Sequence, residues 1–260
     1  MARIIAISNE KGGVAKTTTA VSLGGALAEM GKEVLLIDLD PQANLTLALG
    51  MTPQSIRRSI ADVLFNAATP ISTSRETQVP GLDLIPSNPE MGMAERFLTI
   101  RQRYKFILKD ALSTVNLYDM IILDCPPSMG VVTQNAMTAA DTLLIPTQPE
   151  YFSTYALRNV IQSVKSIREH ENSALEFRIL ITMLDIRIGS HKTLTRQLKA
   201  TFEQAVLNTI IQTDTKFRES TIVGLPITHY VPKTRGAQQY RALAQELTQN
   251  VQAEKISQPA

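Results

Sequence analysis

Short apolar runs recur along the chain, and stretches with helical periodicity separate them. Residues 34–37, 120–123 and 179–181 are continuously apolar, a pattern typical of parallel strands that are buried on both faces. Strands are predicted at residues 3–8, 33–39, 82–86, 118–124, 142–147, 177–184 and 206–211. Helices are predicted at residues 17–30, 91–100, 105–115, 153–169, 192–203 and 236–250. This alternation predicts an α/β fold with a mostly parallel twisted sheet and helices on both of its faces.

No internal repeat and no long linker divides the 260 residues, and one α/β domain can reach this length. We therefore expect a single domain over residues 1–252, followed by a polar, disordered tail at 253–260. Residues 67–80 are rich in Ser, Thr and Pro and predict a surface loop. No apolar run approaches the ~20 residues that a membrane span requires, so we expect no membrane-spanning segment.

The most informative segment is residues 10–18, which lie between a predicted strand and a predicted helix and contain two glycines, two lysines and two threonines. Such a loop binds phosphate, because backbone N–H groups and the helix dipole converge there and favour an anion. Lys16 is placed to reach the β and γ phosphates, and the Thr17 hydroxyl is placed to ligate Mg²⁺. The segment therefore predicts a nucleoside triphosphate site of the P-loop type.

The loop departs from the common spacing G-x-x-x-x-G-K-[ST], since Glu10 and Ala15 stand at the two glycine positions. It fits K-G-G-x-x-K-[ST] instead, which places a second lysine, Lys11, five residues before Lys16. Because Lys16 already serves the chain's own nucleotide, Lys11 suits a nucleotide that a facing subunit holds. An alanine methyl is small, so we expect the loop to form with Ala15 and to lose some backbone freedom there.

Two groups of aspartates follow predicted strands, at the sheet edge where ligands bind in such folds. Asp38 and Asp40 are two residues apart, so in an extended segment both point the same way and are expected to face the phosphates. Asp124 ends the apolar run at 121–123, as a Walker B aspartate does, and is expected to hold the Mg²⁺ shell. The alternative is that each aspartate has no ligand and only caps a helix that follows the strand.

Three motifs make the chain similar to the ParA/MinD ATPases. Residues 11–18 resemble their deviant Walker A box, residues 38–44 their second motif, and residues 122–128 their Walker B motif. Further segments resemble the Soj-like ParA branch, namely residues 145–151, 180–187 and 230–240. The resemblance covers nearly the whole chain.

The resemblance implies roles for individual residues. Lys11 corresponds to the signature lysine that contacts the partner subunit's phosphates, and Asp40 to the aspartate that hydrolysis needs. Asp38 joins Thr17 and Asp124 as a candidate metal residue, and the base is expected near Met183 and residues 211–214. The remaining nucleotide contacts are expected from Gly12, Gly13, Val14, Ala15, Lys16, Thr17, Thr18, Ile211 and Thr213.

The net charge of +2 conceals an asymmetry, because residues 178–241 hold ten Lys and Arg but only four acids. A basic region of this kind suits a polyanion, although solvated helix faces give the same count. The resemblance implies DNA contacts near Arg187 and Lys216, where lysine keeps the charge and loses the forked geometry of arginine. Neighbouring candidates for contact with the phosphate backbone are Lys192, Arg196, Arg218, Lys233 and Arg235.

These features together predict a switch that uses ATP and Mg²⁺. ATP joins two copies into a dimer, the dimer binds DNA without sequence preference, and a ParB-like or cargo adaptor protein stimulates slow hydrolysis. The cargo is a plasmid, a chromosome origin or a protein body. A single cysteine, Cys125, argues for the reducing cytoplasm, and DNA binding places the protein on the nucleoid. With a strand predicted at residue 3, no preceding operator-binding domain is expected.

The sequence argues against three other functions. A membrane-surface switch of the MinD type needs a basic amphipathic C-terminal helix, whereas residues 247–260 are mostly polar. An iron–sulfur electron donor needs two cysteine ligands in each subunit, and the chain has one. A metabolic P-loop enzyme, such as a small-molecule synthetase, requires a further substrate pocket, for which the sequence contains no motif.

Overall fold

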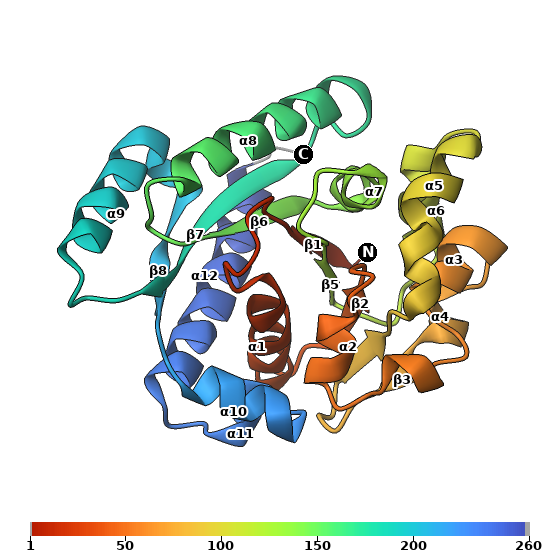
Figure 1. Ribbon diagram of the computed structural model, residues 1–260, viewed down its shortest axis with the longest axis horizontal. Coiled ribbons are helices and arrows are strands. Elements are labelled where there is room, and N and C mark those ends of the chain that lie inside the picture. The colour runs from red at the N-terminus through yellow and green to blue at the C-terminus, as the bar shows by residue number, and fades with distance from the viewer. Residues whose placement is uncertain (1, 258–260) are drawn as a thin grey trace.

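The computed structural model describes residues 2–257 and contains an eight-stranded sheet at its centre (Figure 1). The strand order is β3-β4-β2-β5-β1-β6-β7-β8, and every neighbouring pair is parallel except β3 with β4. The strands are β1 Arg3–Ile7, β2 Val34–Asp38, β3 Arg75–Glu76, β4 Leu82–Ile85, β5 Met120–Asp124, β6 Thr142–Thr147, β7 Glu176–Leu184 and β8 Val206–Gln212. The predicted fold class is confirmed.

Helices cover both faces of the sheet, and each layer has its own apolar core. One core lies under α3, α5, α6, α7, α8 and α9, and the other under α1, α2, α11 and α12 (Figure 1). The helices of the first layer are α3 Ile60–Asn66, α5 Ala94–Phe97, α6 Ile107–Leu112, α7 Val131–Ala139, α8 Ser153–His170 and α9 Gly189–Phe202. The other helices are α1 Lys16–Glu29, α2 Asn44–Ala48, α4 Pro70–Thr73, α10 Lys216–Val223, α11 Ile227–Tyr230 and α12 Arg235–Ser257. Short 3₁₀ turns lie at Pro53–Ser55, Pro89–Met93, Leu98–Ile100, Tyr104–Phe106 and Glu203–Ala205.

The sheet register brings the predicted acidic residues to one edge. Asp124 at the end of β5 is paired with Asp38 at the end of β2 on one side and with Ile7 of β1 on the other. The chain leaves β1 at Ile7 and enters α1 at Lys16, so the loop between them starts beside Asp124. Because all these strands are parallel, their carboxyl ends form a single rim on which a ligand can lie.

Side chains of α12 cover the outer edge of β8. The Glu246 carboxylate accepts hydrogen bonds from the backbone N–H groups of Asn208 (2.7 Å) and Thr209 (2.9 Å). The Gln239 amide oxygen accepts one from the N–H of Gln212 at 2.9 Å. These contacts satisfy strand donors that a sheet edge otherwise exposes.

The structure differs from the predicted elements in three places. The predicted loop at 67–80 contains the short helix α4 and the two-residue strand β3. The predicted helix at 91–100 is broken into 3₁₀, α and 3₁₀ turns. Helices α2, α3, α7, α10 and α11 were not predicted, because each has nine residues or fewer and offers little periodicity.

The prediction of a disordered tail at 253–260 stays a prediction. Helix α12 continues through residues 253–257. Ala253, Glu254 and Lys255 are strong helix formers, and neither Gly nor Pro interrupts the segment. Residues 258–260 lie outside the described part of the chain.

Candidate nucleotide site

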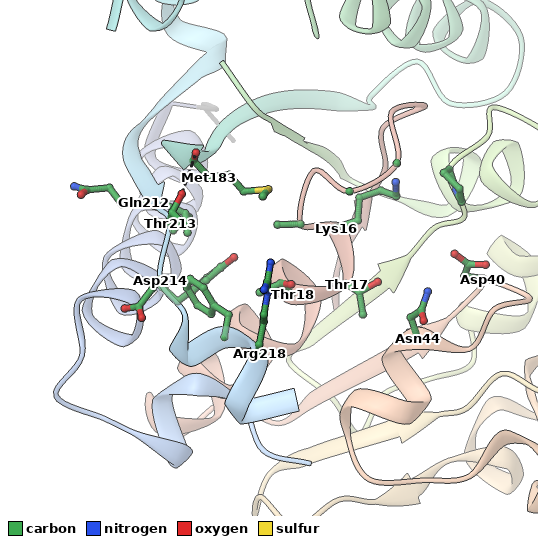
Figure 2. Close-up of a pocket in the computed structure, with 17 residues that line it drawn as sticks. Lys16, Thr17, Thr18, Asp40, Asn44, Met183, Gln212, Thr213, Asp214 and Arg218 are labelled. Carbon is green, nitrogen blue, oxygen red and sulfur yellow. Dashed lines mark hydrogen bonds between the residues drawn. The ribbon is translucent and has the colours of Figure 1, made fainter. Parts of the chain in front are cut away.

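A pocket of about 420 Å³ lies at the carboxyl rim of the sheet, between the loop after β1 and the segment after β8 (Figure 2). The loop and the first turn of α1 line one side of it, and residues 211–218 line the other. Its lining residues are Gly12, Gly13, Ala15, Lys16, Thr17, Thr18, Asp40, Asn44, Pro127, Met183, Ile211, Gln212, Thr213, Asp214, Phe217, Arg218 and Tyr240. The pocket therefore combines the predicted phosphate loop with the predicted base region, which lies almost 200 residues later in the chain.

The loop turns into α1 through a strained residue. Ala15 has φ 68° and ψ 34°, the left-handed conformation, and precedes the helix without a side-chain cap. Glycine adopts this conformation freely, whereas an L-residue with a Cβ atom is disfavoured there by roughly 1–2 kcal/mol. Val14 faces away from the pocket, is buried, and its carbonyl accepts a hydrogen bond from the Thr182 hydroxyl at 3.0 Å. Buried packing thus holds the loop in a shape that its sequence disfavours.

Lys16 is held inside the loop by backbone oxygens. Its Nζ donates to the carbonyls of Asn9 and Lys11, each at 3.1 Å. Burial lowers the pKa of Lys16, and the nearby carboxylates of Asp124 and Asp40 partly oppose this shift. The amine is therefore held beneath the loop before a ligand binds, and it points to where an anion bound by the loop would lie.

Thr17 and Asp124 form the pair expected of a magnesium site. The Thr17 hydroxyl donates to Asp124 Oδ2 at 2.7 Å, and the buried Oδ1 of Asp124 has no hydrogen-bond partner among the described residues. Burial, followed by repulsion from Asp38, raises the pKa of Asp124. Mg²⁺ needs only one or two protein oxygens beside phosphate and water, so a hydroxyl and an unsatisfied carboxylate oxygen fit this ion.

Asp38 and Asp40 do not face the pocket together, contrary to the sequence prediction. Asp38 is fully buried and accepts hydrogen bonds from the N–H (2.8 Å) and hydroxyl (2.7 Å) of Thr46, and burial raises its pKa to about 7. Asp40 lines the pocket and accepts from the N–H of Gln42 at 2.9 Å. The alternation fails because β2 ends at Asp38, so Asp40 already belongs to a turn.

Lys11 lies outside the pocket that Lys16 serves. Its Nζ forms an ion pair with the Glu150 carboxylate, which follows β6, and both side chains are partly exposed. The adjacent Glu10 accepts a hydrogen bond from Asn159 of α8 at 2.9 Å. The start of the phosphate loop is therefore attached to the segment between β6 and α8, a contact that the sequence did not reveal because 139 residues separate the partners.

The base side of the pocket is built by the ends of β7 and β8. Met183 has φ 53° within β7, where the register with β8 is irregular between Ile181 and Leu184. This left-handed residue is strained for a methionine, and it lets the Met183 side chain reach the pocket (Figure 2). Ile211 and Thr213 line the pocket as expected from the resemblance. Gln212 and Asp214 lie in the segment 211–214 that was expected near the base, whereas the lining residues Asn44, Pro127, Phe217 and Tyr240 were not predicted.

The seven predicted DNA contacts differ in their partners, and their role in DNA binding stays a prediction. Arg187 is exposed and paired with Asp185, and Lys216 is paired with Glu219 at 2.7 Å. Arg235 donates to the carbonyl of Thr213 at 2.7 Å, behind the base side of the pocket. The structure places Arg218 in the lining of the nucleotide pocket. Lys192, Arg196 and Lys233 are exposed, and among the described residues their charged groups form no ion pair or hydrogen bond.

Known proteins match the sequence of this chain over most of their own length. The family model described as an AAA domain matches residues 2–177. The chain is 40% identical over 252 residues to the sporulation initiation inhibitor protein Soj of Bacillus subtilis, covering 96% of this chain and 100% of Soj. It is 37% identical over 249 residues to the chromosome partitioning protein ParA of Caulobacter vibrioides, covering 94% of this chain and 93% of that protein. The chain is a member of the ParA/Soj family of partition ATPases.

A solved structure is similar to this chain over nearly its whole length. The structure named cobyrinic acid a,c-diamide synthase from Mycobacterium smegmatis, with bound ATP analogue and magnesium, has a TM-score of 0.86 and 32% identity. The match covers 98% of this chain and 97% of that chain. Family membership confirms the resemblance first seen in the three motifs.

The strain at Ala15 gives a testable prediction. Ala15→Gly removes the left-handed penalty, but it also gives the unfolded chain more freedom, so we expect a net gain of up to about 1 kcal/mol in the free energy of unfolding. Urea unfolding without nucleotide measures it. Ala200→Gly on the exposed face of α9 is the matched control, with an expected loss of about 0.5–1 kcal/mol. Equal losses for both variants would show that Ala15 is not strained.

Proposed function

We propose that this protein is an ATP-dependent switch that dimerises on ATP and Mg²⁺, binds DNA without sequence preference, and positions a cargo. The observation that carries the proposal is the separation of its two loop lysines. Lys16 is tied beneath the loop at the pocket, whereas Lys11 is tied to Glu150 outside it. A lysine that its own pocket does not use, at the edge of that pocket, is placed to serve the nucleotide of a second copy facing it.

Hydrolysis in this proposal uses groups that are already in position. Asp40 lines the pocket and is 7% exposed, so it is placed to orient a water molecule beside the γ-phosphate. Thr17 and Asp124 hold the metal, which supplies charge neutralisation on the β and γ oxygens. Lys16 and the partner copy's lysine at position 11 stabilise the remaining negative charge. A partner protein that completes this arrangement accelerates a reaction that is slow without it.

The DNA surface in this proposal follows the exposed side of α9. Lys192, Arg196 and Lys199 are spaced four and three residues apart, so they lie on one face of the helix, and all three are exposed. His191, Thr195 and Leu198, each one position earlier, are buried on the adjacent face. Lys199 belongs to the basic region at 178–241 but was not among the predicted DNA contacts. Its spacing of seven residues from Lys192 places both on the same face of the helix. Contacts of this kind bind phosphate without reading bases, and they place the protein on the nucleoid.

Two competing functions remain outcomes of the tests. The name of the Mycobacterium smegmatis protein suggests a synthase, but such an enzyme needs a second substrate beside the nucleotide. Cys125, the sole thiol, is buried, and burial raises its pKa, which makes it a poor nucleophile. For the membrane-surface switch, none of the described helices is both long and apolar enough to cross a bilayer. Vesicle flotation with ATP tests surface binding.

The central prediction is that nucleotide controls DNA binding. With a labelled duplex of arbitrary sequence, fluorescence anisotropy is expected to show tight binding with ATP and Mg²⁺, and weak binding with ADP or no nucleotide. The affinity is expected to fall steeply with salt, because counterions are released from the DNA. Equal affinity in all three nucleotide states would contradict the switch, and strong preference for one sequence would contradict non-specific binding.

A second prediction concerns the α9 stripe. Replacing Lys192, Arg196 and Lys199 together by Ala is expected to weaken ATP-dependent DNA binding and to reduce its salt slope by roughly 0.9 for each lost phosphate contact. ATP binding is expected to be unchanged, because none of the three lines the pocket. The control replaces Arg57, Arg96 and Lys109, which are exposed on other elements, namely the segment before α3, α5 and α6, and which remove the same charge. If the two triple variants lose affinity equally, only net charge matters.

A third prediction concerns the ion pair of Lys11. If Lys11 must leave Glu150 to reach a second copy, Glu150→Gln favours the dimer. A half-exposed pair is worth about 0.2–1 kcal/mol and two break per dimer, so the ATP-dependent dimer Kd is expected to fall about two- to thirtyfold. Sedimentation at several concentrations measures it. Glu29→Gln, which removes the pairing with Arg241, is the control and is expected to leave the Kd unchanged. A weaker dimer in Glu150→Gln would mean that Glu150 itself supports the interface.

A further inference from the structure

Arg218 lies in the lining of the nucleotide pocket, a position that contact with DNA does not require. It is the third residue of α10, which begins just after the carboxyl end of β8. It lines the nucleotide pocket on the side opposite the first turn of α1. In Figure 2 its side chain projects into the pocket between the base side, with Met183 and Thr213, and the phosphate side, with Lys16 and Thr17.

The guanidinium of Arg218 has no hydrogen bond or ion pair with any of the described residues. The acid next to it, Glu219, is already engaged by Lys216 Nζ at 2.7 Å and by the Tyr230 hydroxyl at 3.1 Å. Arg235, another arginine of this region, is bound to the Thr213 carbonyl. Arg218 is therefore a cation with five free donors that lies in a pocket and has not been neutralised by the protein.

The other charges that line the pocket already have partners. The amine of Lys16 is held by two backbone carbonyls. Oδ1 of Asp214 accepts from the N–H of Lys216 at 3.0 Å and its Oδ2 from the N–H of Gly236 at 3.4 Å. Oδ1 of Asp40 accepts from the N–H of Gln42. The described lining thus leaves one charged group without a partner, and an anion is what complements it.

The position along the pocket specifies which anion. In a phosphate loop the lysine reaches the β and γ phosphates, and the backbone of the loop cradles the α and β phosphates. Thr18 follows Lys16 and Thr17 on the first turn of α1, toward the base side, and Arg218 points in its direction (Figure 2). A planar guanidinium binds two oxygens of one phosphate at once. We propose that Arg218 binds the α-phosphate of the nucleotide held by its own subunit.

This inference rests on the proposed nucleotide-binding function and assigns Arg218 to the ligand instead of DNA. Because ADP and ATP both carry an α-phosphate, Arg218 is expected to hold both nucleotides equally and not to distinguish the states of the switch. Lys16 and the metal residues remain responsible for recognising the γ-phosphate. The residue therefore contributes to retention of nucleotide through the hydrolysis cycle.

The experiment measures nucleotide affinity without DNA, by displacement of a fluorescent ADP analogue from the full-length protein. Arg218→Ala is expected to weaken ADP, ATP and AMP by the same factor, about tenfold, and to leave adenosine unchanged. Arg218→Lys, which keeps the charge but loses the fork, is expected to recover part of the loss. Arg57→Ala is the control, an exposed arginine outside the pocket, and the thermal unfolding of each variant without nucleotide verifies that it folds.

Three results would overturn the assignment. Unchanged ADP affinity with weakened DNA binding would return Arg218 to the DNA surface. Equal losses for adenosine and ADP would mean that the guanidinium stacks on the base. A loss confined to ATP would place it at the γ-phosphate. Failure of the proposed switch looks different, because it concerns the DNA affinity of the unaltered protein, which the ADP measurement does not involve.

Discussion

Two carboxylates buried side by side set the electrostatics on which the rest of the site depends. Asp38 and Asp124 end adjacent strands in register, and both are almost inaccessible to water. Burial raises the pKa of both, and repulsion from Asp38 raises the pKa of Asp124 further, so the fold tolerates them only with compensating groups nearby. Thr46 satisfies Asp38, whereas Thr17 satisfies one oxygen of Asp124 and leaves the other without a partner. The charge of this rim is therefore balanced best when a cation and a phosphate chain arrive together.

The three cations around the rim lie at different positions relative to the pocket. Lys16 lies beneath the loop, Lys11 is held outside by Glu150, and Arg218 enters from the far side on α10. Each of the three is held in place differently: Lys16 by the loop, Lys11 by Glu150, and Arg218 by its position on α10. They can therefore bind different parts of one ligand. In the proposed cycle, Lys16 and Arg218 hold nucleotide throughout, and only Lys11 changes its partner between Glu150 and a second copy.

The strands and the phosphate loop could be predicted from the sequence because their signals are local. Seven strands appear as apolar runs, and the loop is contiguous between β1 and α1. Contacts formed by distant segments could not be predicted in this way. Glu150 lies far from Lys11 along the chain. Arg218 was predicted as a DNA contact because it neighbours Lys216 in the basic region, and a sequence does not show in which direction such a side chain points. The pairing of Asp38 with Asp40 failed for another reason, since alternation holds only while the strand lasts.

The side chains along β8 have a consequence for how copies of this protein can associate. Glu246 and Gln239 bind backbone donors at the last strand of the sheet, and at the opposite end β3 is only two residues long. Neither end therefore offers a ladder on which a neighbouring molecule could continue the sheet. Growth of the sheet from molecule to molecule, edge to edge, is therefore disfavoured even at high protein concentration. The proposed dimer has to form through another part of the surface.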